Sequence, residues 1–174
     1  MQLQEAITLI RHDYFRVNQQ SSAWADLGSG AGLFTRALSH YLAGGSVIYS
    51  VDREKHAAPL ISGKNIRVIS LQADFEKDDL PIGKLDGIVM ANSLHYVKDK
   101  SAFLQKCKKL FCNEVFLIVE YDTDTPVSQW VPYPISFPSL KTLFASAGYS
   151  RMDKTGERPS LFGNKNIYST LVQE

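Results

Sequence analysis

A glycine-rich turn in the first third of the chain has the residue types and spacing to bind a ligand through its main chain. The segment from Asp26 to Gly32 reads DLGSGAG and lies between an apolar run and a helical pattern. Glycine leaves the main chain open to a ligand, and N–H groups at a helix start lack partners within the helix. A nicotinamide or flavin fingerprint has the spacing G-x-G-x-x-G, but Leu33 stands where the third glycine would be. The turn therefore predicts a site for a ligand other than a dinucleotide.

Two carboxylates accompany this turn. Asp26 ends the preceding apolar run, where a charge has no role in the core and could accept hydrogen bonds from an ammonium group. Asp52 ends the next apolar run, about 20 residues past the turn, which is the spacing at which an acidic residue binds two ribose hydroxyls. The simpler alternatives are glycines that serve only a tight turn and an exposed Asp52 at a strand end. Turn and carboxylates together favour a ligand that contains ribose.

Two further segments contain polar residues that follow expected strands. LQADF at 71–75 contains Asp74, and MANSLHY at 90–96 contains Asn92. In order and spacing over residues 20–125, the glycine turn, Asp52, Asp74 and Asn92 resemble the motif series of class I S-adenosylmethionine-dependent methyltransferases. The resemblance implies that the protein is a methyltransferase and that S-adenosylmethionine is its cofactor.

The resemblance also implies a role for each residue of the series. The turn and Asp26 would lie near the methionine part of the cofactor, with Asn92 beneath that end, and Asp52 would hold the ribose. Arg53 would lie along the adenine, whose amino group and ring face would meet Asp74 and Phe75. Simpler interpretations stay open for Arg53, as a solvated residue, and for Phe75, as core filling. The implied cofactor-binding residues are Asp26, Gly28, Ser29, Gly30, Gly32, Asp52, Arg53, Asp74, Phe75 and Asn92.

His95 is the candidate for a catalytic base. It follows the fourth expected strand, at the edge of the sheet where ligands bind in open α/β folds, and imidazole readily takes up a proton near neutral pH. Methyl transfer is an in-line displacement that mainly requires positioning, so few catalytic residues are needed. The alternative is that His95 packs against the cofactor or caps a turn.

The acceptor is predicted from aromatic residues beyond the fifth expected strand. Tyr121, Trp130 and Tyr133 lie in a proline-rich segment that suits an apolar or planar small molecule, and Tyr14, after the first helix, could close the pocket from the other side. A structural loop with aromatic anchors is the alternative. Ser93 follows Asn92 where methyltransferases of base or glutamine amino nitrogens have a Pro-Pro-aromatic run, which argues against those substrates. No cluster of acidic residues and histidines has metal-ligand spacing, so no metal is expected.

The elements that must position these residues alternate along the chain. Strands are expected at 23–27, 46–51, 66–71, 85–91 and 114–120, and helices at 1–18, 33–42, 54–61, 99–111 and 140–147. Two further strands, at 149–154 and 167–172, are joined by a loop too short for a helical crossover and should pair antiparallel. The fold expected is α/β: a Rossmann-like three-layer sandwich with a mostly parallel seven-stranded sheet and an antiparallel edge hairpin.

Composition limits the remaining functions. The 174 residues suit one domain, 1–174, and a formal net charge of +1 gives no general attraction to nucleic acid or anionic lipid. Lys106, Lys108 and Lys109 are interpreted as a solvated helix face. No apolar run is long enough to span a membrane. We therefore expect a cytoplasmic monomer or homodimer with a small-molecule acceptor; a non-catalytic cofactor-binding partner subunit and an RNA or protein methyltransferase are the alternatives.

Overall fold

The protein is built on one twisted sheet of seven strands. The computed structural model describes residues 1–59, 61, 63–127, 130–160 and 165–174, and its strands lie in the order β3-β2-β1-β4-β5-β7-β6. The first five are mutually parallel, whereas β7 runs antiparallel to β5 and β6 runs antiparallel to β7. Their bounds are β1 Ala23–Leu27, β2 Val47–Asp52, β3 Arg67–Gln72, β4 Gly87–Ala91, β5 Val115–Tyr121, β6 Arg151–Pro159 and β7 Asn166–Gln173.

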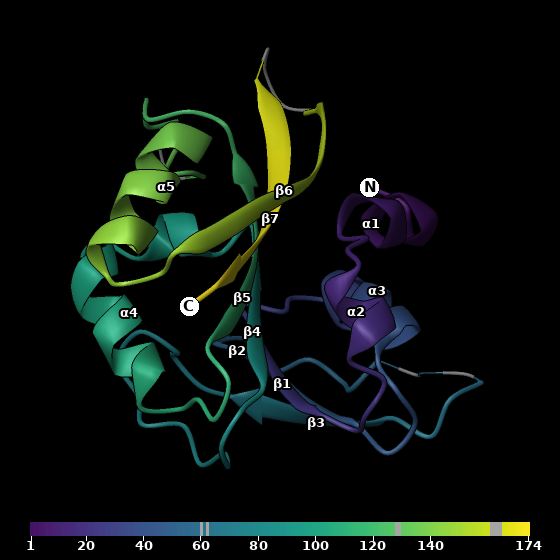
Figure 1. Ribbon diagram of the computed structural model, residues 1–174. Coiled ribbons are helices and arrows are strands. Elements are labelled where there is room, and N and C mark those ends of the chain that lie inside the picture. Colours follow the sequence, from purple (N-terminus) through teal and green to yellow (C-terminus); the bar gives the residue numbers. More distant parts are fainter. Residues whose placement is uncertain (60, 62, 128–129, 161–164) are drawn as a thin grey trace.

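Helices cover both faces of the sheet and make three layers (Figure 1). The helices α1 (Leu3–Leu9), α2 (Tyr14–Val17) and α3 (Leu33–Tyr41) lie on one face, and α4 (Lys100–Lys108) and α5 (Phe137–Ser146) lie on the other. A buried apolar cluster fills each interface. The central strands β4 and β5 are buried along almost their whole length, as expected for parallel strands covered on both sides. The predicted fold class is confirmed.

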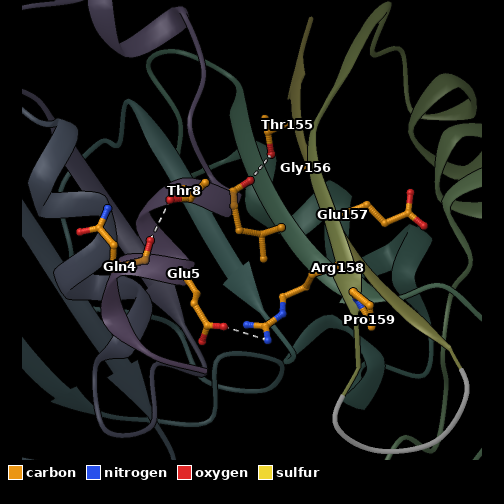
Figure 2. A pocket seen from close by; sticks show the side chains of 9 residues that line it. Gln4, Glu5, Thr8, Thr155, Gly156, Glu157, Arg158 and Pro159 are labelled. Atoms are coloured by element: carbon orange, nitrogen blue, oxygen red, sulfur yellow. Dashed lines mark hydrogen bonds and ion pairs between the residues drawn. The ribbon is translucent and has the colours of Figure 1, made fainter.

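The first helix region is shorter than the sequence indicated. The expected helix over 1–18 is interrupted between α1 and α2, where the chain turns and His12 Nδ1 accepts a hydrogen bond from the Tyr14 N–H. The end of α1 packs on the edge strand β6, where Thr155 Oγ1 donates to the Leu9 carbonyl and Arg158 pairs with Glu5 (Figure 2). On either side of this turn, α1 buries Ala6, Ile7 and Leu9, and α2 buries Phe15.

The expected helix over 54–61 is wrong, since none of the described residues in that range is helical. Asp52 Oδ1 accepts a hydrogen bond from the Glu54 N–H, a local side-chain contact that competes with helix formation. Pro59 lacks an N–H and disfavours helical geometry at the residue before it. The described residues between β2 and β3 are therefore irregular, and some of them line a cavity.

The remaining connections agree better with the sequence. The short 3-10 turn η1 (Leu94–Tyr96) follows β4 and leads into α4, and β6 and β7 form the expected antiparallel hairpin, with β6 longer than predicted. Among the described residues, no helix has the length and apolar character needed to cross a membrane.

Candidate functional site

A cavity of about 700 Å³ opens at the carboxyl ends of β1, β2 and β4. Strand order reverses there, because the chain leaves β1 toward β2 on one side and later returns to β4 on the other. Seven of the ten predicted cofactor-binding residues line it. The lining residues are Gly28, Gly30, Asp52, Arg53, Glu54, His56, Asp74, Phe75, Glu76, Asn92, Ser93 and Tyr96.

The glycine turn forms the floor of this cavity. Gly28, Gly30 and Gly32 have φ values of +81°, +50° and +77°, in the left-handed region that residues other than glycine rarely adopt. A Cβ on Gly28 would lie 2.4 Å from Ser93 Cβ. Only glycine can therefore stand at this position, where the end of β1 comes close to the segment after β4. The Gly28 N–H donates to the Val51 carbonyl at 2.8 Å, which ties the turn to β2.

Two residues of the turn face away from the main cavity. Ser29 Oγ accepts a hydrogen bond from Ser50 Oγ at 2.8 Å and lines a smaller neighbouring cavity. Gly32 caps the start of α3 and lies against Pro59, which a Cβ on Gly32 would meet at 2.7 Å. Both residues therefore shape the turn from outside the cavity.

Asp52 links the turn to the β2 end. Its Oδ2 accepts from the Gly30 N–H at 2.8 Å and its Oδ1 from the Glu54 N–H at 2.9 Å. His56, within the segment expected to be a helix, lines the same cavity with its Nε2 3.9 Å from Asp52 Oδ1. The Arg53 side chain is exposed at the rim. The two main-chain hydrogen bonds therefore hold the Asp52 carboxylate in place in the lining of the cavity.

Asp26 lies behind the turn and does not line the cavity. Its side chain is buried, and Oδ2 accepts from Thr35 Oγ1 of α3 at 2.6 Å. Within the described part of the chain, Oδ1 has no hydrogen-bond partner. Burial raises the pKa of Asp26 to about 7, against the opposing effect of the Thr35 hydrogen bonds. The interpretation that it meets an ammonium group stays a prediction.

A tight turn after β3 forms one wall of the cavity. Asp74 Oδ1 accepts from the Glu76 N–H at 3.1 Å, and Oδ2 lies 3.3 Å from Lys77 Nζ. Partial burial opposes ionisation, but the contact with Lys77 and the Glu76 N–H lower the pKa of Asp74 overall. The Phe75 ring packs edge-on against Phe103 of α4 at 5.7 Å between centroids. An acidic and an aromatic residue thus stand together on this wall.

Asn92 closes the inner end of the cavity with an unusual backbone. Its φ of +53° is the left-handed region, and no other non-glycine residue of the described chain has a positive φ. The Asn92 N–H donates to the Val119 carbonyl of β5 at 2.8 Å, and within the described residues Oδ1 is buried without a partner. Strain of this kind is retained where a site requires it.

His95 belongs to a buried pair that the sequence did not reveal. Its ring Nδ1 lies 2.7 Å from Glu120 Oε2, and its main-chain N–H donates to Glu120 Oε1 at 3.1 Å. Both side chains are at most 2% exposed. In a neutral imidazole, a carboxylate beside Nδ1 fixes the tautomer that carries the proton on that atom, and Nε2 is then an acceptor. Nε2 itself has no partner among the residues that the structure describes. Glu120, a charge directly after the apolar run VFLIV, is the signal that could have pointed to this pair.

Aromatic side chains gather around the His95 end. The His95 ring lies 4.4 Å from that of Tyr96 and 6.1 Å from that of Tyr121, and the Tyr133 N–H donates to the His95 carbonyl. Lys100 Nζ donates to the Val97 and Tyr133 carbonyls, which fastens the proline-rich segment to the chain after η1. Trp130 of the same segment is 78% exposed. Of the predicted acceptor residues, Tyr121 and Tyr133 thus lie beside His95.

Tyr14 lies elsewhere, and the interpretation that it closes the acceptor pocket is wrong. Its ring packs against Phe15 and against Trp24, the second residue of β1. Burial raises its pKa, as do the neighbouring Asp86 and Cys112, which precede β4 and β5. These residues stand at the amino ends of the strands, at the opposite end of the sheet from the cavity. The turn between α1 and α2 places Tyr14 there.

Several residues that line the cavity were not predicted from the sequence. Glu54, His56, Glu76, Ser93 and Tyr96 each lie within four residues of a predicted site residue, so their proximity in sequence was the available signal.

No group of three or more histidine, cysteine, aspartate or glutamate side chains in the described ranges is arranged to hold a metal ion. A second cavity, of about 540 Å³, lies between α1 and β6 (Figure 2) and contains none of the predicted site residues.

Comparison with known proteins decides the family. The model of a family described as "Methyltransferase domain" matches residues 25–119. The chain belongs to this methyltransferase family. No curated protein matches the chain. The methyltransferase match spans the glycine turn, the cavity wall after β3, and η1, so it covers the parts that build the cavity.

Solved structures share the fold of this methyltransferase at low identity. The 1,6-didemethyltoxoflavin-N1-methyltransferase of Burkholderia thailandensis, with S-adenosylhomocysteine bound, has a TM-score of 0.67 and 14% identity over 99% of this chain and 77% of its own. Magnesium protoporphyrin IX methyltransferase of Synechocystis PCC 6803, with S-adenosylmethionine bound, has a TM-score of 0.63 and 15% identity over 99% of this chain and 79% of its own. The YcgJ protein of Bacillus subtilis has a TM-score of 0.61 and 14% identity over 97% of this chain and 96% of its own. The family model confirms the predicted methyltransferase class. The first two of these structures hold S-adenosylhomocysteine or S-adenosylmethionine, the predicted cofactor or its product.

Proposed function

We propose that this methyltransferase transfers the methyl group of S-adenosylmethionine to a small planar acceptor that carries an ionisable O–H or N–H group. One observation carries the proposal: the polar cavity of the glycine turn, Asp52 and Asp74 ends at Asn92 and Tyr96, next to the buried His95–Glu120 pair. The structural neighbours that are named for toxoflavin and protoporphyrin substrates support a small-molecule acceptor.

The residues present fit the cofactor. The left-handed glycines leave the floor open, and a Cβ on Gly28 would close it. Asp52 stands where two ribose hydroxyls would meet a carboxylate, and Asp74 with Phe75 offers an acceptor and a ring face to an adenine. The unpartnered Oδ1 of Asn92 and the buried Asp26 would face or support the methionine end, where an ammonium group needs acceptors.

Methyl transfer then requires that the acceptor be positioned against the methyl group and that it lose one proton. When bound, S-adenosylmethionine supplies a methyl group on an activated sulfonium. Tyr96, Tyr121, Trp130 and Tyr133 would hold the acceptor against the Asn92 end and keep water from the nucleophile. His95 Nε2 would take the proton from the acceptor's O–H or N–H, and Glu120 would stabilise the resulting imidazolium.

Titration calorimetry with S-adenosylmethionine, S-adenosylhomocysteine and NADH tests the cofactor site. We expect micromolar or tighter affinity for the two sulfur compounds and none for NADH. A panel of planar phenols, aromatic acids and nitrogen heterocycles, with release of S-adenosylhomocysteine as the signal, then tests the acceptor. Tight cofactor binding without turnover on any member would favour the partner-subunit alternative. Absence of cofactor binding would overturn the proposed site.

A further inference from the structure

The wall formed by the Asp74–Asp78 turn needs an external anchor. The described chain between β3 and β4 contains no helix, so the turn is not fixed by an element of its own. Internal contacts make it compact: the Asp78 N–H donates to the Asp74 carbonyl at 2.7 Å, and the Asp74 N–H donates to Asp78 Oδ2 at 2.8 Å. None of these bonds attaches the turn to the rest of the molecule.

Lys106 of α4 supplies such an attachment. Its Nζ donates to the carbonyls of Asp78 at 2.6 Å, Glu76 at 3.1 Å and Phe75 at 3.3 Å. An ammonium has three donor hydrogens, and here three carbonyl oxygens of one turn converge on it. Lys106 is therefore not the solvated residue that the sequence indicated.

The same face of α4 also holds the aromatic part of the wall. Phe103 stands one helical turn before Lys106, and its ring packs against Phe75. Phe75 in turn lies close under the glycine turn, since a Cβ on Gly28 would be 3.4 Å from its ring. The distance between floor and wall thus depends on how α4 holds this turn.

We propose that Lys106 is a positioning residue that sets the nucleobase selectivity of the cofactor site. It holds the Phe75 and Glu76 carbonyls in place, and so keeps the Asp74 carboxylate and the Phe75 ring at the spacing that an adenine requires. The inference rests on the cofactor site proposed above. Lys106 contacts the turn and does not line the cavity, so we expect its effect to be on recognition of the base.

The test compares two ligands that differ only at the base, S-adenosylhomocysteine and S-inosylhomocysteine, by titration calorimetry. Wild type should prefer the adenine compound. Lys106→Met keeps the aliphatic stem and removes the donors; we expect affinity for S-adenosylhomocysteine to fall about tenfold, as is usual when outer-shell support is lost, with a smaller fall for the inosine compound. Lys106→Arg should restore part of the preference. Lys109→Met, which removes an exposed charge from the same end of α4, is the matched control and should leave both affinities unchanged.

The outcomes separate this inference from the proposed site. If wild type binds neither compound, the proposed cofactor site fails. If wild type binds and prefers adenine but Lys106→Met has the same preference, or loses both affinities equally, the positioning role is overturned. If Lys106→Met does not fold, Lys106→Gln gives the same comparison, and a preference equal to that of wild type would overturn the inference.

Discussion

The cavity, which is the proposed cofactor end, and the region of the buried His95–Glu120 pair beside it, which is the proposed acceptor end, are built in different ways. At the cofactor end, the floor is main chain: the glycine turn is tied to β2 by backbone hydrogen bonds, and Asp52 accepts from the Gly30 N–H. At the acceptor end, the structure depends on side chains from distant segments, with His95 after β4 paired to Glu120 at the end of β5. Main-chain N–H and carbonyl groups remain when a side chain is substituted, whereas the His95–Glu120 pair is lost with either side chain.

This difference suits the two tasks. Every methyl transfer from S-adenosylmethionine presents the same cofactor, so a fixed main-chain floor serves all of them. Acceptors differ, and a segment such as that containing Trp130 and Tyr133 can vary while the sheet stays unchanged. Substitutions at the two ends should therefore have separable effects, on cofactor affinity and stability at one end and on turnover at the other.

A large expected effect concerns the buried carboxylate behind the turn. Burial raises the pKa of Asp26 to about 7 from an ordinary value of 3.8. Because the folded state binds the proton more tightly, this contribution to stability is complete below about pH 4 and is lost as the pH rises through 7. Between pH 5 and pH 8, the free energy of unfolding of wild type should fall by about 2–3 kcal/mol relative to Asp26→Asn. Urea denaturation at intervals over this range measures the difference, and parallel curves would contradict it.

A matched pair of glycine variants tests the main-chain floor. Gly28→Ala combines a left-handed residue with a Cβ only 2.4 Å from Ser93, whereas Gly30→Ala has the left-handed cost alone because no atom lies within 4 Å. We expect losses of about 2–4 kcal/mol and about 1–2 kcal/mol in the free energy of unfolding, from strain and overpacking. Urea denaturation measures both. Equal losses would show that the contact with Ser93 can relax.

Asp52→Ala tests the ribose assignment. The loss of a hydrogen-bonded carboxylate should weaken binding of S-adenosylhomocysteine by about 1.5–3 kcal/mol, or roughly 10- to 150-fold in Kd, while the protein stays folded. Asp13→Ala, an exposed carboxylate beside α2 and far from the cavity, is the control. Calorimetric affinity equal to that of wild type would remove Asp52 from the site.

The cofactor end was largely readable from the sequence because its signals are local. The glycine turn follows β1 directly, Asp52 is the last residue of β2, and Asp74 lies two residues after β3. The carboxyl ends of parallel strands meet at one edge. The helix predicted over 54–61 failed because the Asp52–Glu54 contact and Pro59 act against a weak helical pattern.

The acceptor end could not be read in this way. The pairing of His95 with Glu120 joins residues 25 apart and exists only because β4 and β5 are neighbours in the sheet. Tyr14 was misplaced because its position depends on how the chain turns between α1 and α2, and the Lys106 contacts depend on where the irregular turn after β3 meets α4. Each of these is a tertiary contact without a periodic signal.

Glu120→Gln is the smallest of the expected effects and the sharpest test of the comparison. The amide keeps the shape of the side chain but removes the charge that would stabilise a protonated His95, so kcat should fall about tenfold, by analogy with carboxylates that orient metal-bound imidazoles. Affinity for S-adenosylhomocysteine should stay the same, because Glu120 does not line the cofactor cavity. Glu114→Gln, near the opposite end of β5 and paired with Lys108, is the matched control and should leave kcat unchanged. A Glu120→Gln variant with lower cofactor affinity and the kcat of wild type would mean that the pair supports the floor, and that the two ends are not independent.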